Sequence, residues 1–176
     1  HGDLSPDNVL VDEGGEAWIT DFGLAVASGV ADRALGTPPY VAPELLVGGA
    51  PTAASDLFAL AAVAALLLAR RTVDVRAFLG RFPAESFLDA AGIPPGDLPE
   101  WARAPLGACL ARDPGRRPTS AVAFARELEA ALGLTPRRPA VASSAAPPFD
   151  HLAGRAELVD RVAAQARGPV VLETRD

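Results

Sequence analysis

The sequence predicts a mainly helical α+β domain in which several helices follow a short β-hairpin. Two short apolar runs, 9–11 and 17–20, flank a Gly-Gly turn, which is the pattern of a hairpin. The segment 52–70 is apolar on nearly every side, as expected for a buried central helix. The segment 118–133 carries apolar residues at helical spacing.

The elements before the central helix have weaker local signals. Residues 1–8 are polar and contain Gly and Pro, which predicts a loop before the hairpin. Residues 21–44 show no clear period and predict an extended loop. Thr52 or Ser55 is expected to cap the start of the helix over 52–70.

Three further helices are predicted after the central one, over 74–90, 98–111 and 118–133. The last of them is the best defined. Pro118 is expected in its first turn, and Gly133 fits the position just after its end, where glycine is favoured.

Composition argues against several classes of protein. The chain has 176 residues, of which 49% are apolar, enough for one buried core and a further fragment. Its net charge of −6 argues against a nucleic-acid-binding surface. All 16 basic residues are Arg, which is typical of a GC-rich bacterial genome. The single Cys109 excludes an internal disulfide, and no Cys/His cluster indicates a metal site.

The N-terminus leads us to expect a piece of a larger protein. The chain starts inside a motif, without Met and without a signal peptide, so further residues are expected before it. The apolar stretch 57–69 is too short to span a bilayer, which needs about 20 residues. A cytoplasmic location is therefore expected, and any membrane anchor would belong to segments outside this chain.

Three polar clusters contain the residues best suited to chemistry. They are 1–8 (HGDLSPDN), 21–23 (DFG) and 36–44 (GTPPYVAPE). Because a single hairpin separates the first two clusters, we expect Asp3, Asn8 and Asp21 to lie at the same end of that hairpin. Asn and Asp supply the hard oxygen ligands that suit Mg²⁺ bound with phosphates. A second Asp nearby can accept a proton from an attacking hydroxyl.

The order of these clusters resembles that of protein kinases. Residues 21–23 match the metal-binding triplet of that family, and 41–44 match the motif that closes its activation segment. Residues 55–60 resemble the start of its central helix, and 113–118 resemble the segment before its last helix. The resemblance covers 1–133 and implies a protein-kinase-like C-terminal lobe with a short catalytic β-hairpin, whose N-terminal lobe is missing from this chain.

The resemblance also implies a role for individual residues. Asp3 would be the catalytic base, and Thr37 would hydrogen-bond it and favour Ser/Thr over Tyr acceptors. Asn8 and Asp21 would hold Mg²⁺ and, through it, the phosphates of ATP. The other implied residues are Ser5 and Gly23 in the nucleotide site, Glu44 paired with Arg117, Asp56 as an acceptor of backbone N–H bonds, and His1 as a packed structural residue.

Two positions depart from the family pattern. Gly2 stands where most regulated kinases carry an Arg that meets a phosphate on the activation loop. Ser5 stands where Ser/Thr kinases carry a Lys that stabilises the transferred phosphate. A catalytically weak pseudokinase scaffold is therefore one alternative. A small-molecule phosphotransferase of the aminoglycoside or choline kinase type is another, although such enzymes lack a segment like 36–44.

A second domain is expected after the helical one. Residues 134–148 are rich in Pro, Ala and Ser and predict a linker. The following run, FDHLAGRAEL, resembles the start of bacterial AAA/STAND-type ATPase domains, so 149–176 would begin an α/β NTPase domain. No phosphate-binding loop occurs by residue 176, and a tail with a chance helix is the alternative.

The two resemblances together imply what the parent protein does. It would transfer the γ-phosphate of ATP to Ser/Thr hydroxyls of proteins in bacterial signalling, with the N-terminal lobe and an ATPase/sensor region in the same chain. Its partners would be ATP, Mg²⁺ and a protein substrate. Without the N-terminal lobe, this stretch alone is expected to be inactive.

Overall fold

A computed structural model of the chain describes residues 1–12, 15, 17–21 and 36–134. Residues 1–10, 19–21 and 36–134 belong to one compact unit, and the hairpin tip within 11–18 belongs to a second. The linker expected over 134–148 lies outside the described residues except for its first residue. The second domain expected over 149–176 lies wholly outside them.

The predicted N-terminal hairpin is present. It is preceded by a 3₁₀ turn, η1 (Pro6–Asn8), and consists of β1 (Val9–Val11) and β2 (Ala17–Ile19), which pair in a two-stranded sheet. After β2, the N–H of Thr20 donates to the C=O of Asn8 at 2.9 Å. This bond brings the residue just before Asp21 back to the end of the 1–8 loop.

The loop expected over 21–44 ends slightly earlier than predicted. A short helix, α1 (Pro43–Leu46), begins at Pro43, whose fixed φ suits the first helical position and whose missing N–H is not needed there. Glu44 therefore lies in the first turn of a helix and not in a loop. Residues 22–35 of the expected loop lie outside the described residues.

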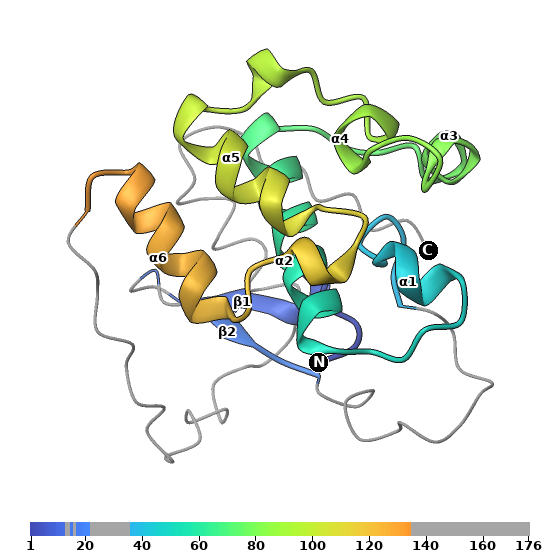
Figure 1. Cartoon of the computed structure of the whole chain (residues 1–176), viewed down its shortest axis with the longest axis horizontal. Coiled ribbons are helices and arrows are strands. Elements are labelled where there is room, and N and C mark those ends of the chain that lie inside the picture. The colour runs from blue at the N-terminus through green and yellow to red at the C-terminus, as the bar shows by residue number, and fades with distance from the viewer. Residues whose placement is uncertain (13–14, 16, 22–35, 135–176) are drawn as a thin grey trace. The chain divides into compact units, whose positions relative to one another are not determined.

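The central helix is α2 (Ala53–Ala69), and it is confirmed close to the predicted bounds. Thr52 and Ser55 form a capping box: Thr52 Oγ1 accepts the Ser55 N–H at 3.3 Å, and Ser55 Oγ accepts the Thr52 N–H at 2.9 Å. Buried residues recur on all sides of the helix, so neighbouring elements surround it (Figure 1). The chain leaves α2 at Arg70, which adopts a left-handed conformation with φ 51°.

The single helix predicted over 74–90 is wrong, because the structure has two short helices there, α3 (Val75–Arg81) and α4 (Phe87–Ala90). Pro83 explains the break, since proline disfavours helical backbone in the residue before it and cannot donate the next helical hydrogen bond. Phe82 is accordingly extended, with ψ 139°. A new N-cap, Ser86, accepts the Asp89 N–H at 3.2 Å and starts α4.

The last two helices are confirmed with shorter bounds, α5 (Glu100–Cys109) and α6 (Ala121–Ala131). In Figure 1, α5 packs on α2 and α6 packs on α5. Ser120 caps α6 by accepting the Ala123 N–H at 3.1 Å, so Pro118 lies before the helix and not in its first turn. Gly133 follows the helix with φ 67°, the left-handed conformation that glycine adopts without strain. Two 3₁₀ turns, η3 (Pro95–Asp97) and η4 (Pro114–Arg116), precede α5 and α6.

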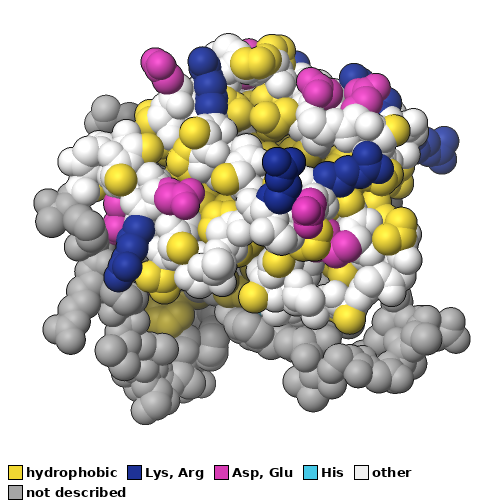
Figure 2. Space-filling view, in the orientation of Figure 1, with side chains coloured by type: hydrophobic (Ala, Val, Ile, Leu, Met, Phe, Trp, Pro, Cys, Tyr) yellow, Lys and Arg dark blue, Asp and Glu magenta, His cyan; other side chains and the backbone are white. Residues whose placement is uncertain are grey.

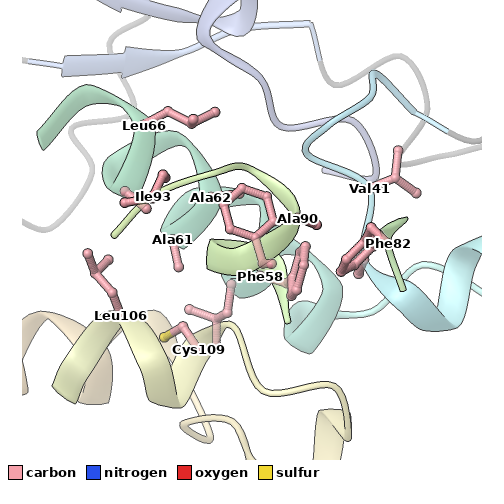
Figure 3. Close-up of a cluster of buried hydrophobic side chains, with 14 of the residues drawn as sticks. Val41, Phe58, Ala61, Ala62, Leu66, Phe82, Ala90, Ile93, Leu106 and Cys109 are labelled. Carbon is pink, nitrogen blue, oxygen red and sulfur yellow. The ribbon is translucent and has the colours of Figure 1, made fainter. Parts of the chain in front are cut away.

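The core lies around α2 and includes a cluster of four Phe rings. Phe58 of α2 is fully buried, and its ring lies 5.9 Å from that of Phe82 and 5.7 Å from that of Phe87. Phe78 of α3 stacks on Phe82 at 4.9 Å. Figure 3 shows the Phe58 and Phe82 rings side by side and Cys109 beside Leu106 of α5. The break at Pro83 therefore lets both flanking Phe side chains reach α2, which one continuous helix would prevent.

Burial gives Cys109 a measurable effect on stability at high pH. Burial raises the pKa of its thiol to about 11; Glu127 adds to the rise and Arg117 opposes it. The unfolded thiol ionises near pH 9, so the folded state holds its proton more tightly between about pH 9 and 11. Stability from this group is complete below about pH 9 and falls as pH rises toward 11.

We expect the free energy of unfolding to fall by about 1 kcal/mol more between pH 7 and 10 in the wild type than in Cys109→Ala. Urea titrations at several pH values measure this difference. Parallel pH curves for the two proteins would contradict the assignment.

Charges of both signs mix on the face shown in Figure 2, with hydrophobic side chains between them. No large area of that face carries charged side chains of only one sign. None of the helices in the described residues combines the length and apolar character needed to cross a membrane.

Candidate active site

His1 holds the 1–8 loop to the end of the hairpin. Its side chain is 5% exposed, Nδ1 accepts the N–H of Asp3 at 3.3 Å, and Nε2 lies 2.8 Å from the C=O of Thr20. Because Nδ1 accepts, Nε2 must carry the proton and donate to Thr20, which fixes the tautomer. Both ring nitrogens are used to shape the backbone, as suits a structural residue.

Asp56 fastens the same loop to the first turn of α2. One carboxylate oxygen accepts the N–H of Gly2 at 3.0 Å, and the other lies 2.8 Å from the backbone nitrogen of His1. Gly2 itself has φ 86°, a conformation that favours glycine. The position of the loop is thus set by the most buried helix of the domain.

Asp3 is held from two sides. Its Oδ1 accepts the backbone N–H of Thr37 at 2.8 Å, and its C=O accepts Asn8 Nδ2, also at 2.8 Å. The expected hydrogen bond between Thr37 and Asp3 is therefore present, and its donor is the main-chain amide of Thr37. Asn8 is only 5% exposed, and with its NH₂ group bound to Asp3 its amide oxygen is the atom suited to bind a cation.

Asp21 lies at the same end of the hairpin. Thr20, the preceding residue, is hydrogen-bonded both to Asn8 and to His1. Asp21 is exposed and has φ 60°, a left-handed conformation that Asp tolerates better than most side chains. The structure therefore brings the backbone of Asp3, Asn8 and Asp21 together through one hydrogen-bonded group. Gly23 lies outside the described residues.

Ser5 lies inside the loop. The residue is 1% exposed, and its C=O accepts the N–H of Asn8 at 3.0 Å. The hydroxyl is thus enclosed by protein in this structure, and its contact with a nucleotide stays a prediction.

The oxygen ligands of the site fit Mg²⁺ bound together with a nucleotide. In the described part of the chain, no group of three His, Cys, Asp or Glu residues could hold a metal ion by itself. Magnesium bound with phosphates needs only one or two protein oxygens, because phosphates and waters complete its shell. Asn8 and Asp21 offer one amide and one carboxylate oxygen, which meets that requirement.

The segment after Gly36 forms a turn that presents Thr37 to Asp3. The N–H of Tyr40 donates to the C=O of Thr37 at 3.0 Å and closes the turn. Burial, reinforced by the carboxylate of Asp7, raises the pKa of Tyr40. Its hydroxyl therefore keeps its proton at neutral pH and can donate a hydrogen bond.

Glu44 and Arg117 form a bidentate ion pair between α1 and the segment before α6. Both nitrogen–oxygen distances are 2.7 Å, from Nη1 to Oε1 and from Nη2 to Oε2. Arg117 is 5% exposed, and its guanidinium lies over the Phe58 ring at 5.1 Å from the centroid. A buried planar pair of this kind fixes orientation as well as distance.

The other donors of Arg117 bind backbone carbonyls. Nε donates to the C=O of Ala111 at 2.9 Å, Nη1 to Ala54 at 2.8 Å, and Nη2 to Arg112 at 3.4 Å. All five N–H groups of the guanidinium are thereby used. Arg117 thus joins α1, α2 and the segment after α5, and it adds to the packing of Val41, Ala42 and Leu45 in the hydrophobic core.

Several residues that shape the site carry no sequence signal for it. Thr20 links His1 and Asn8, and Ala54 and Ala111 support Arg117 only through their carbonyls. Main-chain acceptors leave no trace in side-chain identity, so a motif search cannot find them. Thr20 could have been noticed only from its place directly before the DFG triplet.

Comparison with known proteins agrees with this geometry. Residues 1–128 match the family described as "Protein kinase domain". The serine/threonine-protein kinase PknK of Mycobacterium tuberculosis is 34% identical over 137 residues, which cover 73% of this chain and 12% of that protein. Serine/threonine-protein kinase PkaB of Streptomyces coelicolor is 37% identical over 134 residues, covering 66% of this chain and 31% of that protein.

PknA of Corynebacterium glutamicum is 33% identical over 126 residues, covering 66% of this chain and 26% of that protein. The chain thus spans less than a third of the length of each of these relatives. The family match extends over most of the chain and includes the loop, the DFG triplet and the Glu44–Arg117 pair. This chain belongs to the protein kinase domain family.

Proposed function

We propose that the protein containing this chain is a serine/threonine protein kinase that transfers the γ-phosphate of ATP to protein Ser/Thr hydroxyls in bacterial signalling. The observation that carries the proposal is the fixed carboxylate of Asp3, which lies in one hydrogen-bonded group with Asn8 and the residue before Asp21. The named relatives are all serine/threonine-protein kinases, which supports the same class of acceptor.

Each residue has a distinct part in the proposed reaction. The acceptor hydroxyl oxygen bonds to the γ-phosphorus, the bond from that phosphorus to the bridging oxygen of ADP breaks, and the hydroxyl proton passes to Asp3. Asn8 and Asp21 would hold Mg²⁺, which would neutralise charge on the phosphates. Thr37 would border the acceptor site, and Ser5 and Gly23 would belong to the nucleotide site, as the resemblance to kinases implies.

The two departures from the family pattern favour one second candidate, a scaffold with weak turnover. Ser5 supplies no positive charge where kinases have Lys, and Gly2 supplies none for an activation-loop phosphate. Asp3, Asn8 and Asp21 are all retained, which favours the active enzyme over the scaffold.

The proposed domain arrangement places the C-terminal lobe at 1–133, a linker at 134–148 and the start of an AAA/STAND-type ATPase domain at 149–176. The glycine-rich loop and the ATP-anchoring Lys would belong to an N-terminal lobe encoded before His1. We also propose that the protein acts in the cytoplasm.

A direct test is phosphate transfer from labelled ATP by the full-length protein in the presence of Mg²⁺. We expect label on Ser and Thr of a protein or peptide acceptor and none on choline or aminoglycosides. Label on the small molecules would support the phosphotransferase alternative. ATP binding without transfer to any acceptor would support the scaffold.

A further inference from the structure

The contact between Thr37 and Asp3 depends on the backbone at Gly36. Gly36 has φ 61°, in the left-handed region that side chains other than glycine rarely occupy. This conformation turns the next peptide so that the Thr37 N–H points at Asp3 Oδ1, 2.8 Å away. The donor is a main-chain amide, so the side chain of Thr37 does not decide whether this bond forms.

The atoms around Gly36 leave little room for a side chain. A Cβ at this position would lie 3.3 Å from Val41 Cγ2, 3.4 Å from Asp3 Oδ1 and 3.7 Å from the C=O of Gly2. One of these three atoms is the carboxylate oxygen that accepts the Thr37 N–H. A Cβ at position 36 would therefore crowd Val41 and lie in contact with the Asp3 oxygen that accepts the Thr37 N–H.

The surroundings leave little room for adjustment. Gly36, Thr37, Asp3 and Asp56 line the same cavity, whose volume is only about 10 Å³. That volume is about what a single water needs, so the enclosed part of the cavity is small. Among the described residues no hydrogen bond to Asp3 Oδ2 is found.

We propose that Gly36 is a positioning residue, which uses the Thr37 amide to fix Asp3 Oδ1 and so aims Oδ2 at the hydroxyl of the acceptor. The inference rests on the proposed role of Asp3 as base. It assigns to the backbone at 36–37 a function separate from that of the Thr37 side chain. Fixing one oxygen of the base raises the fraction of complexes in a reactive geometry without adding contacts to ATP.

The test compares Gly36→Ala with Gly92→Ala in the full-length protein. Gly92 has a similar φ of 66°, but a Cβ there meets nothing within 4 Å, so it controls for backbone strain alone. We expect Gly36→Ala to lower kcat by about 100-fold with KM for ATP unchanged within about twofold. Gly92→Ala should retain wild-type kcat and lose only the thermal stability that backbone strain costs, and Gly36→Ala should lose somewhat more because its Cβ also meets Val41. Equal kcat in the two variants would overturn the inference.

A second measurement does not depend on the folding of Gly36→Ala. In ¹⁵N-threonine-labelled wild-type protein, the Thr37 amide proton should resonate downfield, as a donor to a carboxylate, and move upfield in Asp3→Ala. A Thr37 signal unaffected by Asp3→Ala would refute the hydrogen bond and the inference with it. A wild-type protein unable to transfer phosphate would instead refute the proposed function, so the two failures are distinguishable.

Discussion

Asparagine in place of Asp3 is expected to lower kcat for Ser/Thr phosphorylation by about 10²- to 10⁴-fold. An amide oxygen can still accept the Thr37 N–H, so Asp3→Asn keeps the shape of the loop. What it loses is the ability to take the proton of the acceptor hydroxyl. Transfer of labelled phosphate from ATP to a peptide by the full-length protein measures the effect.

Asp7→Asn is the matched control for this substitution. Asp7 is an exposed carboxylate on the same loop, so its replacement removes the same charge without touching the proposed base. We expect Asp7→Asn to stay within about threefold of wild-type kcat and Asp3→Asn to bind ATP normally. If Asp3→Asn kept wild-type turnover, Asp3 would not be the base.

Arg117→Ala should destabilise the domain by about 3–5 kcal/mol, which is a large share of the total stability of a domain this size. The substitution leaves Glu44, 19% exposed, without its charge partner, and removes the hydrogen-bond donors of three carbonyls. It also removes the guanidinium from the face of Phe58. Urea unfolding followed by circular dichroism measures the loss.

Arg116→Ala provides the comparison for Arg117→Ala. Arg116 is exposed and adjacent in sequence, so its removal should change stability by no more than about 0.5 kcal/mol. Arg117→Lys keeps the charge but offers three donors in place of five, and it should fall between the two. Nearly equal free energies of unfolding for Arg116→Ala and Arg117→Ala would show that the Glu44–Arg117 pair does not stabilise the domain.

Elements with strong local patterns could be predicted from the sequence. The central helix α2 follows from a long apolar run with a capping residue, and the hairpin follows from two short apolar runs around glycines. The segment around Pro83 differs from the single helix predicted because the proline ends α3 and a second helix starts after it. Phe82 and Phe87 on either side of the break pack against Phe58, a tertiary contact that the local sequence does not reveal.

The candidate site was predictable in its side chains but not in its main chain. The motifs point to Asp3, Asn8 and Asp21, and the hydrogen bonds place their backbones together. The hydrogen bond between Thr37 and Asp3 was expected, but which atom of Thr37 donates could not be foreseen, because a motif does not distinguish a main-chain amide from a side chain. The left-handed backbone of Asp21 likewise depends on the fold around it.

The two contacts between Asp56 and the 1–8 loop determine which substitutions the loop can accept. Its two partners are main-chain nitrogens, that of Gly2 and the N-terminal nitrogen of His1, so the anchor needs no side chain at position 2. The carboxylate itself has no such freedom, since an amide in its place would keep only one accepting oxygen. A glycine at position 2, where φ is 86°, therefore leaves the loop fastened to α2, whereas a change of the carboxylate would weaken the attachment.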